Sequence, residues 1–320
     1  MNAIQRLISK ESFVGEFWNS APSWSGPVAR RIPVEAGIHR LLPRNPHIIE
    51  YLGFHVNKQL RMVRHYTTFA DSGDLMSLAC NHVTPGRAVD EHGKFLPRAV
   101  DANGNAIPPL PIPVVAVVYI FQAMAAGACL MAHGEVPDDE GRLPDNQSPA
   151  WNHDIIRRDI KLANYFLSSS ESSAIWARLP IAALGDFGNE FDATSLMGAR
   201  SSHAMGTKYY MAPEQVSNEG TTYTVTSATN IYQIGLTILT LMHLQVPGAE
   251  ADFDHEDRVP FPGFPNGATF YPQDLIDLAE DCVQLLPRNR PKPIKLYKDI
   301  RDLATSYPNP SSKDVPWRKC

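Results

Sequence analysis

Cysteine is scarce in this 320-residue chain, and its few thiols lie far apart. The four residues are Cys80, Cys129, Cys282 and Cys320, and no two of them form a C-x-x-C pair. Such spacing argues against a disulfide framework and against a zinc site. We therefore expect reduced thiols in a cytosolic or nuclear protein.

An excess of positive charge is also missing. The chain has 29 Lys and Arg against 34 Asp and Glu, a net charge of -5, which gives no electrostatic reason to expect nucleic acid as a partner. The first residues, MNAIQRLISKESF, contain no apolar run followed by a small-residue cleavage site, so they do not predict a secretory signal. With 43% apolar and 20% charged residues, the composition is that of a globular protein.

Long apolar runs are rare, and one of them requires a decision. Residues 112–132 carry no charge and approach the roughly 20 residues that span a membrane. No Lys/Arg cluster flanks this run, and it contains Pro113, Gln122 and Gly127. We therefore predict a buried core helix and no membrane association.

Polar stretches with proline and glycine, residues 81–111 and 135–152, predict two surface insertions. The segment after them, IIRRDIKLANYFL, predicts a short strand, a turn and a second strand-like run over 164–167. Farther on, residues 232–244 are apolar nearly all round and predict a fully buried helix. Residues 271–303 show helical spacing that Pro287 and Pro291 break into pieces.

Four polar side chains on two stretches of chain have the chemistry of phosphoryl transfer. Asp159 can orient an attacking hydroxyl and accept its proton, and Lys161 can offset charge on the transferred group. Asn164 can provide an amide oxygen to Mg²⁺, and Asp186 in LGDFGNE can provide the second, carboxylate ligand.

These residues stand in motifs of a known family. RRDIKLAN resembles the kinase catalytic loop H-R-D-x-K-x-x-N, DFG is present unaltered, and GTKYYMAPE resembles the end of the activation segment. Three such motifs in this order resemble a eukaryotic-type serine/threonine protein kinase over roughly residues 35–305. The resemblance implies an α+β, two-lobed protein-kinase-like fold that binds ATP and Mg²⁺ and phosphorylates a protein substrate.

Domain limits follow from the same resemblance. They are a reduced, β-containing N-lobe over residues 1–69, with its helix from about 34, and a mostly helical C-lobe with the hinge over 70–320. By that likeness Thr67 would be the gatekeeper, Thr68 to Ala70 would face adenine, and Asp74 would reach the ribose. The full set implied to bind the nucleotide is Glu35, Thr67, Thr68, Ala70, Asp74 and Phe166.

Further residues follow the family pattern in the helical part. NIYQIG (230–235) resembles the buried helix that braces the catalytic loop, although kinases usually have Asp where Asn230 stands. Arg290 matches the arginine that pairs with the A-P-E glutamate, here Glu214. Lys161 and the G-T-x-x-Y pattern resemble kinases that act on Ser or Thr.

Arg158 is typical of kinases whose activation segment is held by a phosphate. The hydroxyls offered as phosphorylation sites are Thr194, Ser195, Ser201, Ser202 and Thr207, and ordinary loop hydroxyls are the alternative for each.

The pattern breaks in the N-terminal part. No G-x-G-x-x-G precedes Glu35, and no lysine is visible in the expected context. Lys10 is the only lysine before Glu35, and Arg31 in VARRIP stands too close to that glutamate for the usual strand-to-helix connection. The catalytic-loop histidine is replaced by Arg157, and His39 falls where an apolar side chain is usual.

Three explanations stay open: a truly reduced lobe, a coding sequence that lacks its first segment, or a pseudokinase that kept its metal ligands by chance. A pseudokinase binding module, with a protein partner or activator, is therefore the alternative to a kinase. A small-molecule kinase of the aminoglycoside type would share Asp159 and Asn164, but GTKYYMAPE and Arg290 speak against it.

Overall fold

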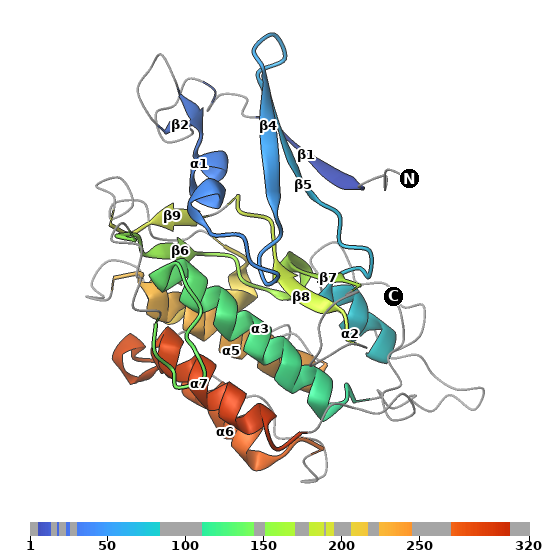
Figure 1. Ribbon diagram of the computed structural model, residues 1–320, viewed down its shortest axis with the longest axis vertical. Coiled ribbons are helices and arrows are strands. Elements are labelled where there is room, and N and C mark those ends of the chain that lie inside the picture. The colour runs from blue at the N-terminus through green and yellow to red at the C-terminus, as the bar shows by residue number, and fades with distance from the viewer. Residues whose placement is uncertain are drawn as a thin grey trace, which may run out of the picture.

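The structure is a computed structural model with a sheet-bearing part above a helical part (Figure 1). It describes residues 6–13, 18, 24–25, 31–83, 111–143, 151–169, 179–188, 190–194, 206–216, 224–244 and 270–307. The predicted insertions lie partly outside the described residues, which end at 83 and 143 and resume at 111 and 151.

The sheet-bearing part is built on three antiparallel strands. They are β1 (Leu7–Phe13), β4 (Tyr51–Asn57) and β5 (Met62–Thr68), in the order β1-β5-β4. Sequences such as YLGFHVN and MVRHYTT are rich in the β-branched and aromatic residues that favour strands. A second pair, β2 (Trp24–Ser25) and β3 (Ile32–Pro33), leads into helix α1 (Val34–Leu41).

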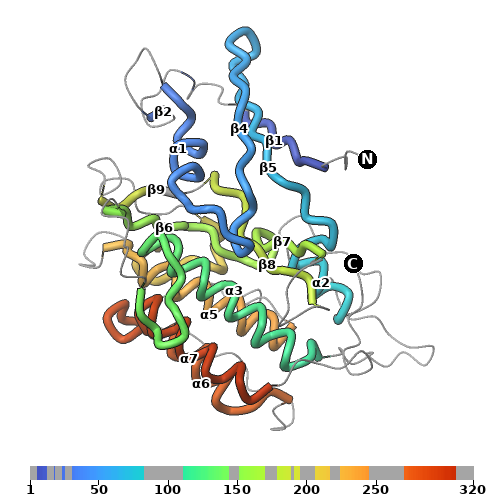
Figure 2. The backbone as a smooth tube through the Cα atoms, viewed as in Figure 1, coloured from blue at the N-terminus to red at the C-terminus, as the bar shows by residue number. Residues whose placement is uncertain are grey.

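Helix α3 (Val114–His133) runs along the side of the helical part nearest the sheet-bearing part and packs against both α5 and α7 (Figure 2). Among the described residues it is the one helix long and apolar enough to cross a membrane, yet 83% of its most apolar window is buried within the protein. It ends where Gly134 adopts φ 73° and its N–H donates to the Leu130 carbonyl, an ending that glycine favours. The prediction of a buried core helix is confirmed.

Helix α5 (Ser227–His243) is buried along almost its whole length. The predicted apolar helix is therefore present, and it begins earlier than the apolar run because Thr226 and Thr229 form a capping box. Gly235 lets α6 (Gln273–Cys282) approach closely, since a Cβ there would lie 2.4 Å from the Cβ of Cys282. Helix α7 (Pro293–Ala304) follows the predicted proline break.

Short elements join the two parts. Two antiparallel pairs are β6 (Ile155–Arg157) with β9 (Glu190–Asp192), and β7 (Tyr165–Ser168) with β8 (Ile181–Leu184). Within the described ranges, the remaining helices are α2 (Leu75–Val83), α4 (Pro213–Val216) and the 3-10 turns Leu162–Asn164, Lys208–Tyr210 and Pro287–Asn289.

Two backbone hydrogen bonds lock the segment before β4 onto β8. Ile49 N donates to Leu184 O (2.8 Å), and Leu184 N donates to His47 O (2.9 Å). These bonds attach the sheet-bearing part to the strand that leads directly to Asp186.

Candidate active site

The catalytic loop runs from β6 to the 3-10 turn at residues 162–164 and brings three predicted side chains together. Lys161 Nζ lies 3.1 Å from Asp159 Oδ2, and Asn164 Nδ2 donates to Asp159 O (2.8 Å) and Oδ2 (3.2 Å). Asp159 and Asn164 are buried. The amide oxygen of Asn164 takes no part in either bond, so the loop holds Asn164 through its nitrogen.

Thr207, from GTKYY, closes this cluster from the activation segment. Its N–H (3.0 Å) and hydroxyl (2.6 Å) both donate to Asp159 Oδ1, and Lys161 Nζ donates to its hydroxyl (2.7 Å). Burial raises the pKa of Asp159, but the Thr207 hydrogen bond and the Lys161 charge outweigh it, and the pKa falls below its ordinary value. Asp159 is therefore an oriented carboxylate at neutral pH.

Glycine at 206 is required by the geometry of this closure. Gly206 adopts φ 129°, and a Cβ would lie 2.2 Å from the carbonyl oxygen of Arg158. A side chain at this position would therefore force the activation segment away from the catalytic loop.

Asp186 follows β8 and points its carboxylate at the sheet-bearing part. Its φ of 59° is in the left-handed region, and Asp186 Oδ1 lies 2.5 Å from Lys10 Nζ. Burial raises the pKa of Asp186, whereas Lys10 and then Arg157 lower it, and the net pKa is below the ordinary value. The preceding Gly185 donates its N–H to Asn164 O (3.0 Å), which ties Asp186 to the catalytic loop.

Lys10 corrects the expectation that no strand lysine is present to pair with Glu35. Lys10 lies in β1, and its Nζ is 3.0 Å from Glu35 Oε1 in α1. Arg31, the faint sequence candidate, is exposed. The sequence signal was the lone lysine in the β-favouring run LISKESF, but only the pairing of β1 with β5 brings Lys10 toward α1.

Arg157 and His39 occupy a column of side chains beside Asp186. The Phe187 ring lies between them, 4.2 Å from the His39 ring and 5.0 Å from the Arg157 guanidinium carbon. Arg157 Nη2 donates to Asp186 O (2.8 Å), and the His39 Nε2 contacts Ile49 O at 2.8 Å. Both departures from the family pattern thus lie in one buried column, where each of the two side chains contacts a backbone carbonyl through one nitrogen.

Helix α5 braces the catalytic loop from below, as its resemblance implied. Asn230 Oδ1 accepts the N–H of Arg157 (2.8 Å), and Asn230 Nδ2 donates to Ile155 O (2.9 Å). Gln233 Oε1 accepts the N–H of Ile160 (3.1 Å). An uncharged amide therefore does the bracing here, because one side chain both accepts and donates.

The predicted pair between Glu214 and Arg290 is confirmed. The guanidinium nitrogens lie 2.6 and 2.9 Å from the two carboxylate oxygens, and both side chains are fully buried. Thr229 also donates to Glu214 (2.7 Å). The pair fixes the end of the activation segment on α5 and the turn at residues 287–289.

The residues implied to bind adenine and ribose lie near the end of β5. Thr67 and Thr68 are its last two residues, and Ala70 follows in the connection to α2. Asp74 forms an isolated β-bridge with Phe166, and its Oδ1 accepts the N–H of Ser77 (2.7 Å), which caps α2. The structure therefore brings Asp74 and Phe166 together, while one Asp74 oxygen is already engaged.

Two of the five phosphorylation candidates are within the described residues. The Thr194 hydroxyl donates to Asp192 Oδ1 (2.7 Å), and Thr207 is engaged with Asp159 as above. Arg158 is buried with its guanidinium carbon 5.1 Å from the Phe191 ring. Ser195, Ser201 and Ser202 lie outside the described residues.

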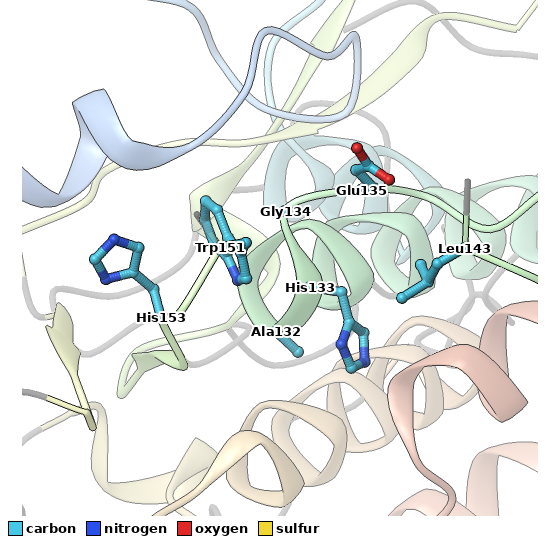
Figure 3. A pocket seen from close by; sticks show the side chains of 7 residues that line it. All are labelled: Ala132, His133, Gly134, Glu135, Leu143, Trp151 and His153. Atoms are coloured by element: carbon cyan, nitrogen blue, oxygen red, sulfur yellow. The ribbon is translucent and has the colours of Figure 1, made fainter. Parts of the chain in front are cut away.

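A hollow at the end of α3 is separate from this cluster (Figure 3). Side chains that line it include His133, Glu135, Trp151 and His153, and no predicted site residue does. His153 is engaged by Asp192, with Nδ1 2.6 Å from Oδ2. In the part of the chain that the structure describes, no group of three or more His, Cys, Asp or Glu is placed to hold a metal.

Mg²⁺ prefers a small set of hard oxygen ligands rather than a closed protein cage. Asp186 and Asn164 offer a carboxylate and an amide oxygen on segments joined by the Gly185–Asn164 hydrogen bond. The donor chemistry therefore fits a magnesium ion carried with a nucleotide.

A small sheet above a helical body, with these motifs gathered where the two meet, resembles the arrangement of protein kinases. Residues 150–299 match the family model of the protein kinase domain. Over 178 residues the chain is 28% identical to the mitogen-activated protein kinase kinase mkk1 of Cytospora mali, covering 51% of this chain and 26% of that protein. It is 30% identical over 161 residues to the mitogen-activated protein kinase kinase MST7 of Pyricularia oryzae, covering 46% of this chain and 35% of that protein.

A third relative is the serine/threonine-protein kinase dst2 of Dictyostelium discoideum, 27% identical over 48% of this chain and 14% of that protein. The chain thus spans about a third or less of the length of these curated relatives. The resemblance to the eukaryotic-type serine/threonine protein kinase family is confirmed by these matches.

Proposed function

We propose that this protein transfers the γ-phosphate of Mg-ATP to Ser or Thr hydroxyls of a protein substrate. The observation that carries the proposal is the convergence of Lys10, Glu35 and Asp186 beside Asp159, Lys161 and Asn164. The matched protein kinase domain over residues 150–299 supports it.

Each side chain has a role that its geometry supports. Asp159, held by Thr207 and Asn164, orients the acceptor hydroxyl and takes its proton, and Lys161 offsets charge on the phosphoryl group. Lys10, kept in place by Glu35, provides an ammonium for the ATP phosphates. Asn164 and Asp186 would hold Mg²⁺, which neutralises phosphate charge when bound.

The nucleotide base would lie along the connection from β5 to α2. We propose Thr67 as the gatekeeper, backbone groups of Thr68 to Ala70 toward adenine, and Asp74 toward the ribose. The bridge between Asp74 and Phe166 supports this placement, because it joins the connection to β7, the strand that follows the catalytic loop.

We also propose a location in the cytosol or nucleus. Among the described residues, Cys129 and Cys282 are buried thiols outside any disulfide, which suits a reducing compartment.

The alternative, a pseudokinase module that binds partners, is favoured by one sequence feature: no G-x-G-x-x-G motif is present. Phosphate transfer separates the two functions. We expect the protein to transfer labelled phosphate from Mg-ATP and Asp159→Ala to be slower by about 100- to 10,000-fold, the range of general-base catalysis.

The control for this assay is Asp302→Ala, an exposed aspartate of α7, which should transfer at the wild-type rate. Equal labelling by wild type and Asp159→Ala would assign the activity to a contaminant. A wild-type melting curve unchanged by Mg-ATP would refute nucleotide binding.

A further inference from the structure

Glu35 faces a second polar group besides Lys10. Its Oε1 is 3.0 Å from Lys10 Nζ, and its Oε2 is 3.6 Å from His65 Nε2. The other ring nitrogen, His65 Nδ1, is 3.1 Å from the Tyr51 hydroxyl. A continuous series therefore runs from Tyr51 through His65 to the carboxylate that holds Lys10.

The strand register explains why these side chains meet. Lys10 is directly opposite His65 across β1 and β5, so both project from the same face of the sheet. Tyr51 pairs with Thr67, two residues from His65 and on that same face. Regular pairing would place Leu52 opposite Thr67, but the register shift between Tyr51 and Gly53 puts Tyr51 there instead.

Charge decides which way the hydrogens point. His65 is 3% exposed, and burial lowers its pKa, so the ring is neutral at pH 7 and has one N–H. Nε2 faces a carboxylate oxygen, and a bare lone pair there would be repelled by the negative charge. Nε2 therefore takes the hydrogen, and Nδ1 accepts from the Tyr51 hydroxyl, whose pKa burial raises to about 12.

We propose that Tyr51 and His65 are positioning residues that orient Glu35, and through Glu35 the ammonium of Lys10. The Tyr51 hydroxyl selects the Nε2–H tautomer of His65, and that N–H faces the Glu35 oxygen that Lys10 does not use. This inference rests on the proposed function, in which Lys10 contacts the ATP phosphates.

A set of matched variants tests the kinetic part of the inference. His65→Leu removes the N–H from a buried position that suits an apolar side chain, and His65→Gln keeps one donor and one acceptor. We expect His65→Leu to lower kcat/KM for Mg-ATP about tenfold, less than the ~100-fold that a 1 Å misplacement can cause. His65→Gln should recover most of this loss, and Tyr51→Phe should lie between the two.

The control is His55→Asn, an exposed histidine on β4, which should keep the wild-type kcat/KM. Unfolding midpoints of all variants accompany the kinetics, because a positioning role predicts lost transfer in His65→Leu without a matching loss of stability. Wild-type kinetics in His65→Leu, or equal loss in His65→Leu and His65→Gln, would overturn the proposal.

A second readout does not depend on activity. The ¹⁵N chemical shifts of the His65 ring at neutral pH distinguish Nε2–H from Nδ1–H. We expect Nε2–H in the wild type and a shifted Nδ1 signal in Tyr51→Phe, whereas an Nδ1–H ring in the wild type would refute the inference. If the wild type transferred no phosphate, the proposed function would fail. The ring shifts would still show whether His65 has the Nε2–H tautomer that the contacts with Tyr51 and Glu35 require.

Discussion

One ion pair lies within the helical part and another joins it to the sheet-bearing part, and the two differ in how far they are exposed. Arg290 and Glu214 are both 0% exposed and make two parallel contacts, whereas the Lys10 and Asp186 side chains are 40% and 41% exposed. A buried bidentate pair fixes one arrangement of the chain. The Lys10 ammonium stays accessible to solvent, as the proposed contact with the ATP phosphates requires.

The comparison also explains where the structure tolerates change. Around the catalytic loop, side chains from α5 and α4 satisfy backbone groups through Asn230, Gln233 and Gln215. In the sheet-bearing part, Glu35 depends on contacts between single side chains, Lys10 and His65. We therefore expect substitutions of these bracing amides to affect folding, and substitutions around Lys10 to affect turnover.

The largest effect should come from breaking the buried pair. Arg290→Met leaves the Glu214 carboxylate buried without its guanidinium, so we expect a loss of about 3–5 kcal/mol in the free energy of unfolding, measured in urea. Arg142→Met is the control, because Arg142 is 71% exposed beside Asp138 and should contribute about 0–1 kcal/mol. Equal losses in the two variants would contradict the contrast between buried and exposed pairs.

A second effect concerns pH and the column beside Asp186. Burial lowers the pKa of His39 from 6.5 to about 4, so the neutral ring is the form that fits the folded protein. The stability that the folded protein gains from keeping this ring neutral is therefore fully present above pH 6.5, and it is lost as the pH falls toward 4. Between pH 7 and pH 4 the wild type should lose about 3 kcal/mol more stability than His39→Leu, as measured by denaturant unfolding at each pH.

The other histidines and the carboxylates titrate in both proteins, so the difference between the two curves isolates His39. Parallel curves over this range would show that the ring can be protonated without disturbing Phe187.

The smallest effect on stability should accompany a large effect on turnover. Lys10→Met removes two ion pairs in which the lysine side chain is 40% exposed, so we expect the unfolding free energy to fall by about 1 kcal/mol, less than for Arg290→Met. Transfer of labelled phosphate should fall about 100- to 1,000-fold, the range for loss of one preorganised charged donor. Lys295→Met, which removes an exposed pair with Asp299, should change neither quantity.

Stability lost by Lys10→Met to the same extent as by Arg290→Met would contradict the division of roles. Unchanged transfer would remove Lys10 from the site.

Local sequence patterns were enough to predict the main helices and the paired residues of the helical part. The apolar runs at 112–132 and 232–244 predicted α3 and the core of α5, and their burial is confirmed. The Glu214–Arg290 pair could be predicted because both residues stand in motifs. The motifs also identified Asp159, Lys161 and Asn164, which lie within six residues and meet through one turn of chain.

The sequence pattern did not predict that Lys10 pairs with Glu35, because this contact depends on how the strands pair. Nothing in LISKESF sets which strand β1 pairs with or which face its side chains take, and a shift of one residue would turn Lys10 away from α1. The same holds for Tyr51, because its place beside His65 depends on a register shift in β4. Motif matching compared only VARRIP with the family pattern and set Arg31 aside because it stands too close to Glu35, so neither Arg31 nor Lys10 was assigned as the partner of Glu35.

The sequence by itself determined which side chains are available: a carboxylate, an ammonium and an amide in one loop, a second acid in DFG, and apolar runs long enough to bury. Only the tertiary structure decided that Lys10 holds Glu35 and that Arg157 and His39 enclose Phe187. Helical and loop contacts are set by spacing along the chain. Contacts between strands depend on the pairing register, and the register is fixed by which face of the sheet packs against segments far away in the sequence.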